Sequence, residues 1–137
     1  MGACVVALAG CPKGKPEVRV EIASVGDTMA FDKKEITVPA GSRVTLVLKN
    51  NATSPVMTHN WILVTEGKVD EVGQAAVAVP AEQGHIPIHP AILARTPLSR
   101  PGETVSVTFD APPAGRYEFL CSTPGHYMQM RGIFIVK

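Results

Sequence analysis

The sequence predicts an all-β protein, a sandwich or a barrel built from short strands. Apolar and polar residues alternate in several short segments, which is typical of strands with one buried face. Turn-forming residues separate these segments, since the 137 residues include 12 glycines and 12 prolines, which disfavour long helices. Valine, isoleucine and threonine, which favour strands, are also frequent.

The predicted strands follow one another between turn signals. Two of these signals are clear, at residues 39–41 and 112–115. We expect strands at residues 18–22, 34–38, 44–49, 60–65, 105–109, 116–121 and 132–136.

Residues 66–100 interrupt this pattern. The Ala/Val-rich segment 69–79 could hold a short helix. Prolines at positions 80, 87, 90 and 97 preclude a continuous helix after it. We therefore expect a flap insertion that crosses one side of the sandwich.

Composition indicates one globular domain at residues 17–137. Hydrophobic residues make up 45% of the chain and charged residues 18%, an ordinary balance for a folded protein. A chain of this length can bury a continuous core without disulfides. The formal net charge is +1 and there is no basic run, so nothing indicates a nucleic-acid partner.

Residues 1–16 form an apolar N-terminus followed by a tether. Leu8-Ala9-Gly10-Cys11 resembles a bacterial lipobox, which implies that Cys11 becomes a lipidated residue. The alternative is an apolar terminus in which Cys4 and Cys11 stay unpaired or join in a small loop. No stretch reaches the ~20 apolar residues that a membrane-spanning helix needs.

Residues 121–130 combine three metal-binding side chains on one loop between two predicted strands. Cys121 offers a thiolate, His126 an imidazole and Met130 a thioether. Soft sulfur together with imidazole favours copper over calcium or magnesium. Two histidines, one cysteine and a weak axial methionine describe an electron-transfer copper site.

His59 supplies the second histidine, at the start of a predicted strand. The period of two along a strand places it on the same face as Trp61 and Leu63. The same period places Cys121 on the face of Tyr117 and Phe119. Both ligands are therefore predicted to point into one end of the sandwich.

The paired motifs resemble those of cupredoxins, the type 1 blue-copper proteins, in their azurin and auracyanin branch. The resemblance rests on the spacing of Cys121, His126 and Met130 and on the triplet His59-Asn60-Trp61. It implies a Greek-key β-sandwich with one mononuclear copper ion that alternates between Cu(I) and Cu(II). By the same resemblance, His59, Cys121 and His126 form a trigonal plane with Met130 as the axial ligand.

Two further positions take their roles from this family. Asn60 would tie the two ligand loops together. Azurins place a glycine before the first histidine and use its carbonyl as a distant fifth contact, and Thr58 stands there in this sequence.

Met128 is a rival for the axial position, although the family spacing favours Met130. His85 and His89 could form a second metal site, but prolines 87 and 90 spoil a helix there, so we interpret them as flap residues.

The resemblance implies a one-electron carrier rather than an enzyme. Such proteins move electrons between membrane-associated redox complexes and cytochromes, so the expected partners are a quinol-oxidising complex, a c-type cytochrome, an oxidase or a reaction centre. The expected location is extracytoplasmic, with a lipid anchor at Cys11, and the expected state is a monomer. We expect electrons to leave at the His126 ring edge, through a patch made by Pro124, Tyr127 and Met128.

Three other functions compete with this interpretation. A periplasmic copper carrier or chaperone would bind the same ion and hand it over. A multicopper oxidase needs histidines beside the cysteine, where this chain has Leu120 and Ser122, and a binuclear centre needs a second nearby cysteine. A metal-free adhesion-type sandwich would use none of these residues as ligands.

Overall fold

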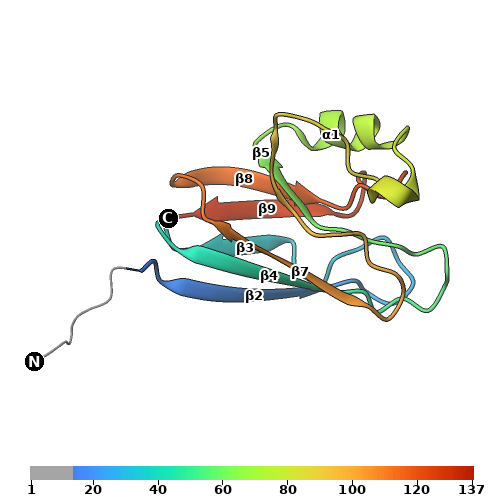
Figure 1. The fold of residues 1–137 in the computed structure, drawn as a ribbon, viewed down its shortest axis with the longest axis horizontal. Helices are drawn as coiled ribbons and strands as arrows, with labels where there is room; N and C mark the ends of the chain where they lie inside the picture. Colours follow the sequence, from blue (N-terminus) through green and yellow to red (C-terminus); the bar gives the residue numbers. More distant parts are fainter. Residues whose placement is uncertain (1–13) are drawn as a thin grey trace, which may run out of the picture.

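The computed structural model describes residues 14–137 and shows a sandwich of two β-sheets (Figure 1). One sheet contains β2 (Glu17–Ala23), β4 (Arg43–Lys49) and β7 (Thr104–Asp110), in the order β2-β4-β7. The other contains β3 (Glu35–Val38), β9 (Arg131–Val136), β8 (Gly115–Leu120), β5 (Ile62–Thr65) and β6 (Ile92–Arg95), in the order β3-β9-β8-β5-β6. The predicted all-β sandwich is confirmed.

The chain passes repeatedly between the two sheets, as expected for a Greek-key sandwich. Only the connections β5–β6 and β8–β9 stay within one sheet. The pairs β2–β4 and β3–β9 are parallel, and the remaining strand pairs are antiparallel.

The core between the sheets follows from the alternation in the strands. Val44, Leu46 and Leu48 of β4 point inward and are fully buried. Trp61, which directly precedes β5, meets them from the other sheet, with its ring centroid 5.7 Å from that of Phe119 and 6.0 Å from that of Phe134. Full burial of one such large side chain contributes ~1.5–3 kcal/mol. Packing of these side chains therefore holds the two sheets together.

A second, smaller cluster covers part of the outer face of the larger sheet, over β5 and the end of β8. Ile62, Val64 and Leu120 point away from the main core and pack against Val69 and Val72. These last two residues belong to α1 (Val69–Ala76), the short helix predicted for the flap, which is followed by the 3-10 turn η1 (Ala81–Gln83). The strand β5 and the last two residues of β8, Phe119 and Leu120, are therefore buried on both faces.

The flap also contains the strand β6, which the sequence analysis did not predict. Ile92–Arg95 pairs antiparallel with β5, with a register shift between Leu63 and Val64. No helix within residues 14–137 is both long and apolar enough to cross a membrane. The cysteines at positions 4 and 11 lie outside the described residues.

The two ends of the sandwich differ. β2 begins at one end, where the backbone N–H of Arg43 donates to the Pro16 carbonyl and Lys15 pairs with Asp110. At the other end, β8 runs into Cys121 and His59 pairs with Ser99. The candidate metal ligands therefore lie at the end opposite to the point where the chain enters the fold (Figure 1).

Candidate metal centre

His59, Cys121 and His126 converge in the folded protein, although His59 lies far from the other two in the sequence. Their ligand atoms all lie within 4.8 Å of one another, and all three residues are buried. Within residues 14–137 they are the one such group of histidine, cysteine and acidic side chains. The Cys121 Sγ is 3.7 Å from the His59 Nδ1 and 3.8 Å from the His126 Nδ1.

These distances fit one metal ion shared by the three side chains. Metal–nitrogen bonds of ~2.0 Å and metal–sulfur bonds of ~2.3 Å are usual in protein sites with these donors. At 120° around a common centre, such bonds would separate nitrogen and sulfur by ~3.7 Å. The donor set of two imidazoles and one thiolate, with a thioether nearby, is the one that selects copper.

Burial sets the protonation of the donors. Desolvation, followed by the charge of His126, lowers the pKa of His59 to about 4. Desolvation also lowers the pKa of His126, with a smaller contribution from His85. Both rings are therefore neutral near pH 7 and keep a lone pair for a metal. Burial raises the pKa of the Cys121 thiol, so metal binding must displace its proton.

Short backbone hydrogen bonds hold the ligand loop 121–130. The Cys121 N–H donates to the Met130 carbonyl at 2.9 Å, and the Met130 N–H donates to the His126 carbonyl at 2.8 Å. The His126 N–H donates to the Thr123 carbonyl at 2.9 Å. These hydrogen bonds join the two ends of the loop and keep Cys121, His126 and Met130 close together.

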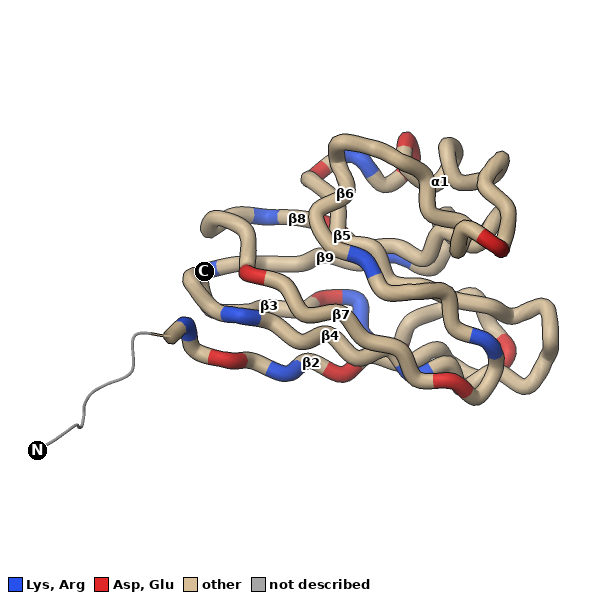
Figure 2. The backbone as a smooth tube through the Cα atoms, viewed as in Figure 1, with Lys and Arg blue, Asp and Glu red and all other residues tan. Residues whose placement is uncertain are grey.

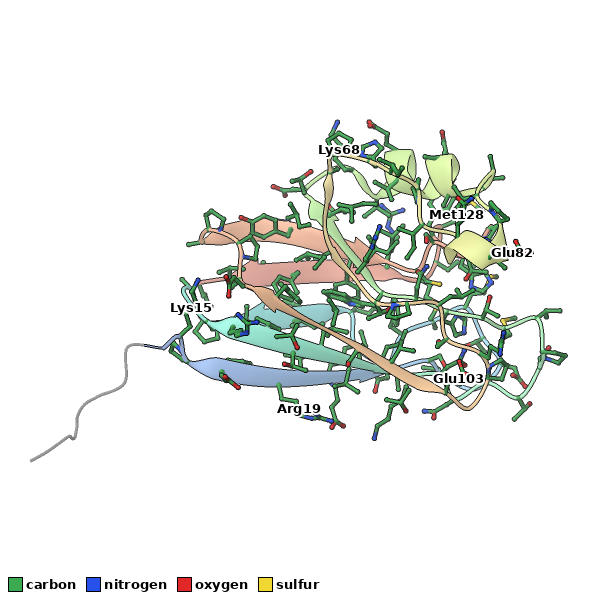
Figure 3. The ribbon with its side chains drawn as sticks, viewed as in Figure 1. Lys15, Arg19, Lys68, Glu82, Glu103 and Met128 are labelled. Atoms are coloured by element: carbon green, nitrogen blue, oxygen red, sulfur yellow. The ribbon has the colours of Figure 1, made fainter. Side chains whose placement is uncertain are left out.

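The two methionines of this loop lie in different environments. Met130 is fully buried in the same core cluster as Cys121. Met128 is 64% exposed and lies on the outside of the molecule (Figure 3). Burial therefore favours Met130 over Met128 for the axial position.

His59 is held by a residue that sequence reasoning missed, Ser99. The His59 N–H donates to the Ser99 carbonyl, while the Ser99 N–H and Oγ both donate to the His59 carbonyl at 2.7 Å. The Asn50 Nδ2 also donates hydrogen bonds to the carbonyls of Met57 and Ser99. The His59 Nδ1 faces the site, 3.7 Å from the Cys121 Sγ, whereas Nε2 is buried without a hydrogen-bond partner among residues 14–137.

Asn60 links the His59 strand to the Cys121 loop. Its Oδ1 accepts from the Ser122 N–H at 2.8 Å, and its Nδ2 donates to the Ser122 Oγ at 2.9 Å. The Asn60 Nδ2 also donates to the Gly84 carbonyl, and the Ser122 Oγ donates to the His85 carbonyl at 2.6 Å. The expected link between the two ligand segments therefore extends to the flap.

Thr58 and the two flap histidines have partners of their own. The Thr58 carbonyl accepts from the Thr123 hydroxyl at 2.8 Å. The His85 Nδ1 lies 2.8 Å from the Val79 carbonyl, and the His89 Nε2 lies 2.6 Å from a Glu71 carboxylate oxygen. His85 and His89 are not brought together, so they remain flap residues. His85 has a φ of 55°, a left-handed conformation that a single sequence does not reveal.

The residues of the predicted exit patch flank His126 in the sequence. Pro124 and Met128 are exposed, whereas Tyr127 is half-buried. His126 itself is 6% exposed. Residues 50–65 and 119–130 contain no Lys, Arg, Asp or Glu, and Figure 2 shows both segments as uncharged.

Comparison with known proteins gives a consistent result. The model of the family "copper binding proteins, plastocyanin/azurin family" matches residues 17–137. Auracyanin-A of Chloroflexus aurantiacus is 43% identical over 133 residues, covering 90% of this chain and 77% of the relative. Azurin of Pseudomonas fluorescens is 34% identical over 128 residues, covering 88% of this chain and 99% of the relative.

Solved structures are similar over most of their length. Auracyanin A of Chloroflexus aurantiacus, described as a "blue" copper protein, has a TM-score of 0.82 at 43% identity, covering 88% of this chain and 99% of that one. The dithionite-reduced auracyanin of Roseiflexus castenholzii has a TM-score of 0.79 at 39% identity, covering 87% of this chain and 96% of that one.

Proposed function

The chain belongs to the plastocyanin/azurin family of copper-binding proteins, and from this premise we propose that it is a type 1 copper protein that carries single electrons. Its cofactor is copper. The observation that supports the proposal most strongly is the convergence of two buried imidazole nitrogens on one buried thiol, at 3.7 and 3.8 Å.

Each ligand has a distinct role in the proposal. His59, Cys121 and His126 would hold the copper ion, with Met130 as a fourth, weaker ligand. Bound copper supplies a one-electron couple between Cu(I) and Cu(II). The side chains contribute by staying in place, since a site that does not rearrange suits both oxidation states. Asn60 keeps the two ligand segments at a fixed separation through its hydrogen bonds to Ser122.

The protein itself catalyses no reaction in this proposal. Four protein ligands leave no position for a substrate, and all four residues are buried. The same closed site supports retention of the ion rather than its delivery to another protein. Transfer of copper to an acceptor apoprotein, measured by gel filtration, would instead identify a copper carrier.

Electrons leave at His126, through the patch of Pro124, Tyr127 and Met128. His126 lies on the loop that closes the end of the sandwich, and residues 50–65 and 119–130 at this end carry no charged side chains. An apolar patch lets a partner approach without stripping water from charges, which would be costly. Such a surface suits brief encounters, because redox complexes bury little area.

The partners are other redox proteins, which the carrier meets outside the cytoplasm. A quinol-oxidising complex, a c-type cytochrome, an oxidase and a reaction centre are the family-level candidates for donor and acceptor. The carrier acts as a monomer, and lipidation of Cys11 holds it at the outer face of a membrane. The lipobox resemblance at residues 8–11 supports this anchor.

The test of the proposal is the substitution Cys121→Ser. The copper-loaded protein is expected to absorb strongly in the visible range, because charge moves between the Cys121 thiolate and Cu(II). The hydroxyl of Cys121→Ser is a poor replacement for a soft thiolate, so nearly all of this absorption should disappear. The control is Ser106→Ala, on the exposed side of β7. Strong colour that persists in Cys121→Ser would refute the assignment.

A further inference from the structure

The helix α1 contacts two residues that each directly follow a proposed ligand, one in the ligand loop and one at the start of β9. Tyr127 follows His126, and its ring lies against Gly73 of α1. Arg131 follows Met130, and its Nη1 donates to the Asp70 carboxylate of α1 at 2.8 Å. Figure 1 shows α1 on the outside of β5 and β8, over the end that carries the loop.

The contact between Gly73 and Tyr127 requires glycine. A Cβ atom built on Gly73 would lie 2.5 Å from the Tyr127 Cδ1 and 2.6 Å from its Cδ2, far inside van der Waals contact. The aromatic ring therefore packs directly on the helix backbone. Gly73 is buried, and Tyr127 packs against the cluster that includes Val69 and Val72.

The second contact joins Asp70 of α1 to Arg131, the first residue of β9. Both side chains are partly exposed, at 69% and 37%, and exposed ion pairs contribute little. Asp70 and Gly73 are three residues apart on α1, so they lie on one face of the helix. Tyr127 and Arg131 thus contact the same face of α1, at positions one helical turn apart.

A glycine in the interior of a helix is unfavourable unless something requires it. Glycine costs ~1 kcal/mol relative to alanine at such a position. Gly73 is the only glycine within α1, and none of its backbone dihedrals requires glycine, since its φ is not positive. The close packing of the Tyr127 ring explains why glycine occupies position 73.

From these contacts we propose that α1 positions the ligand loop, with Gly73 and Asp70 as positioning residues for His126 and Met130. The helix does so through its contacts with Tyr127 and Arg131, the residues that directly follow these ligands. This inference rests on the proposed roles of His126 and Met130. It gives the flap a part in shaping the copper site, in addition to covering the sheet.

The test compares Gly73→Ala in two backgrounds. In the otherwise unchanged protein, the added methyl group should displace Tyr127, so the metal-free protein should melt at a lower temperature despite the better helix former. In the Tyr127→Ala background the obstacle is gone, and the same substitution should raise the melting temperature. This reversal of sign does not depend on copper.

The copper-loaded variants provide the second measurement. Gly73→Ala should shift the visible absorption maximum and the reduction potential, and Asp70→Asn should shift them less. Gln74→Ala, at an exposed neighbouring position on α1, is the matched control and should change neither. Destabilisation by Gly73→Ala in both backgrounds, or an unchanged spectrum and potential in Gly73→Ala, would overturn the inference. Absence of the absorption band from every protein, the unchanged one included, would instead count against the proposed function.

Discussion

At the scale of single residues, burial distinguishes the two methionines of the ligand loop. Met130 is fully buried beside Cys121. In Met130→Leu we expect copper and colour to remain while the reduction potential rises, because loss of a weak donor and gain of an apolar group both disfavour Cu(II). A rise of about 59 mV would correspond to a tenfold change in relative affinity for the two oxidation states. Voltammetry measures this rise, and its appearance in Met128→Leu instead would move the axial role to Met128.

The exposed Met128 tests the exit patch. In Met128→Glu we expect slower electron self-exchange, because two charged patches repel each other and must lose water on contact. The visible spectrum should stay nearly unchanged, since no ligand is touched. Met128 is a better probe than Tyr127, whose ring supports the contact with Gly73. The matched control is Ala114→Glu in the β7–β8 turn at the opposite end, and equal self-exchange rates in the two variants would place the exit elsewhere.

The residues of the site differ in how far the sequence can predict them. The period of two along a strand correctly placed Trp61 with Leu63, and Cys121 with Phe119, in relation to the main core. Ser99 and the His85 carbonyl could not be predicted in this way. They reach the site through contacts across more than 30 positions of sequence, and neither carries a spacing pattern.

At the scale of elements, β9 packs closely because of Gly132. A Cβ atom there would lie 2.7 Å from the Lys34 carbonyl oxygen and 2.8 Å from the Phe119 Cε1. We expect Gly132→Ala to destabilise the fold by ~1–3 kcal/mol, the usual cost of overpacking. Denaturant unfolding of the metal-free protein measures this, and Gly14→Ala, where a Cβ meets nothing within 4 Å, is the control. Equal stability of the two variants would contradict the expected overlap.

The strands that could be predicted have a strong local pattern, and β6 does not. Ile92–Arg95 shows the burial pattern of an edge strand in which only Ala94 is buried, so alternation gives little signal. Its place beside β5 depends on pairing across the flap, including a register shift. Local pattern therefore predicted the sandwich, and long-range pairing decided the structure of the flap.

At the scale of the whole molecule, the proposed anchor can be tested directly. Expressed behind a complete signal in a suitable bacterium, the protein should partition with membranes, and Cys11→Ser should release it. Stable attachment requires more than one acyl chain, and bacterial lipoproteins of this type carry several, so the release should be nearly complete. Fractionation followed by immunoblotting measures it, with Cys4→Ser as the control. Equal membrane fractions for Cys11→Ser and the unchanged protein would exclude lipidation at Cys11.

The opposite placement of the chain entry and the ligand loop has a geometric consequence. β2 starts beside Arg43 and Asp110, whereas the loop that carries His126 follows β8 at the far end of the sandwich (Figure 1). A molecule held by its N-terminus would therefore be held at the end of the sandwich opposite to the ligand loop. A freely diffusing partner could then approach the His126 end directly, whereas a complex embedded in the same membrane could do so only when the carrier turns that end toward it. The length of the segment before Glu17 would then decide which of the two exchanges is faster.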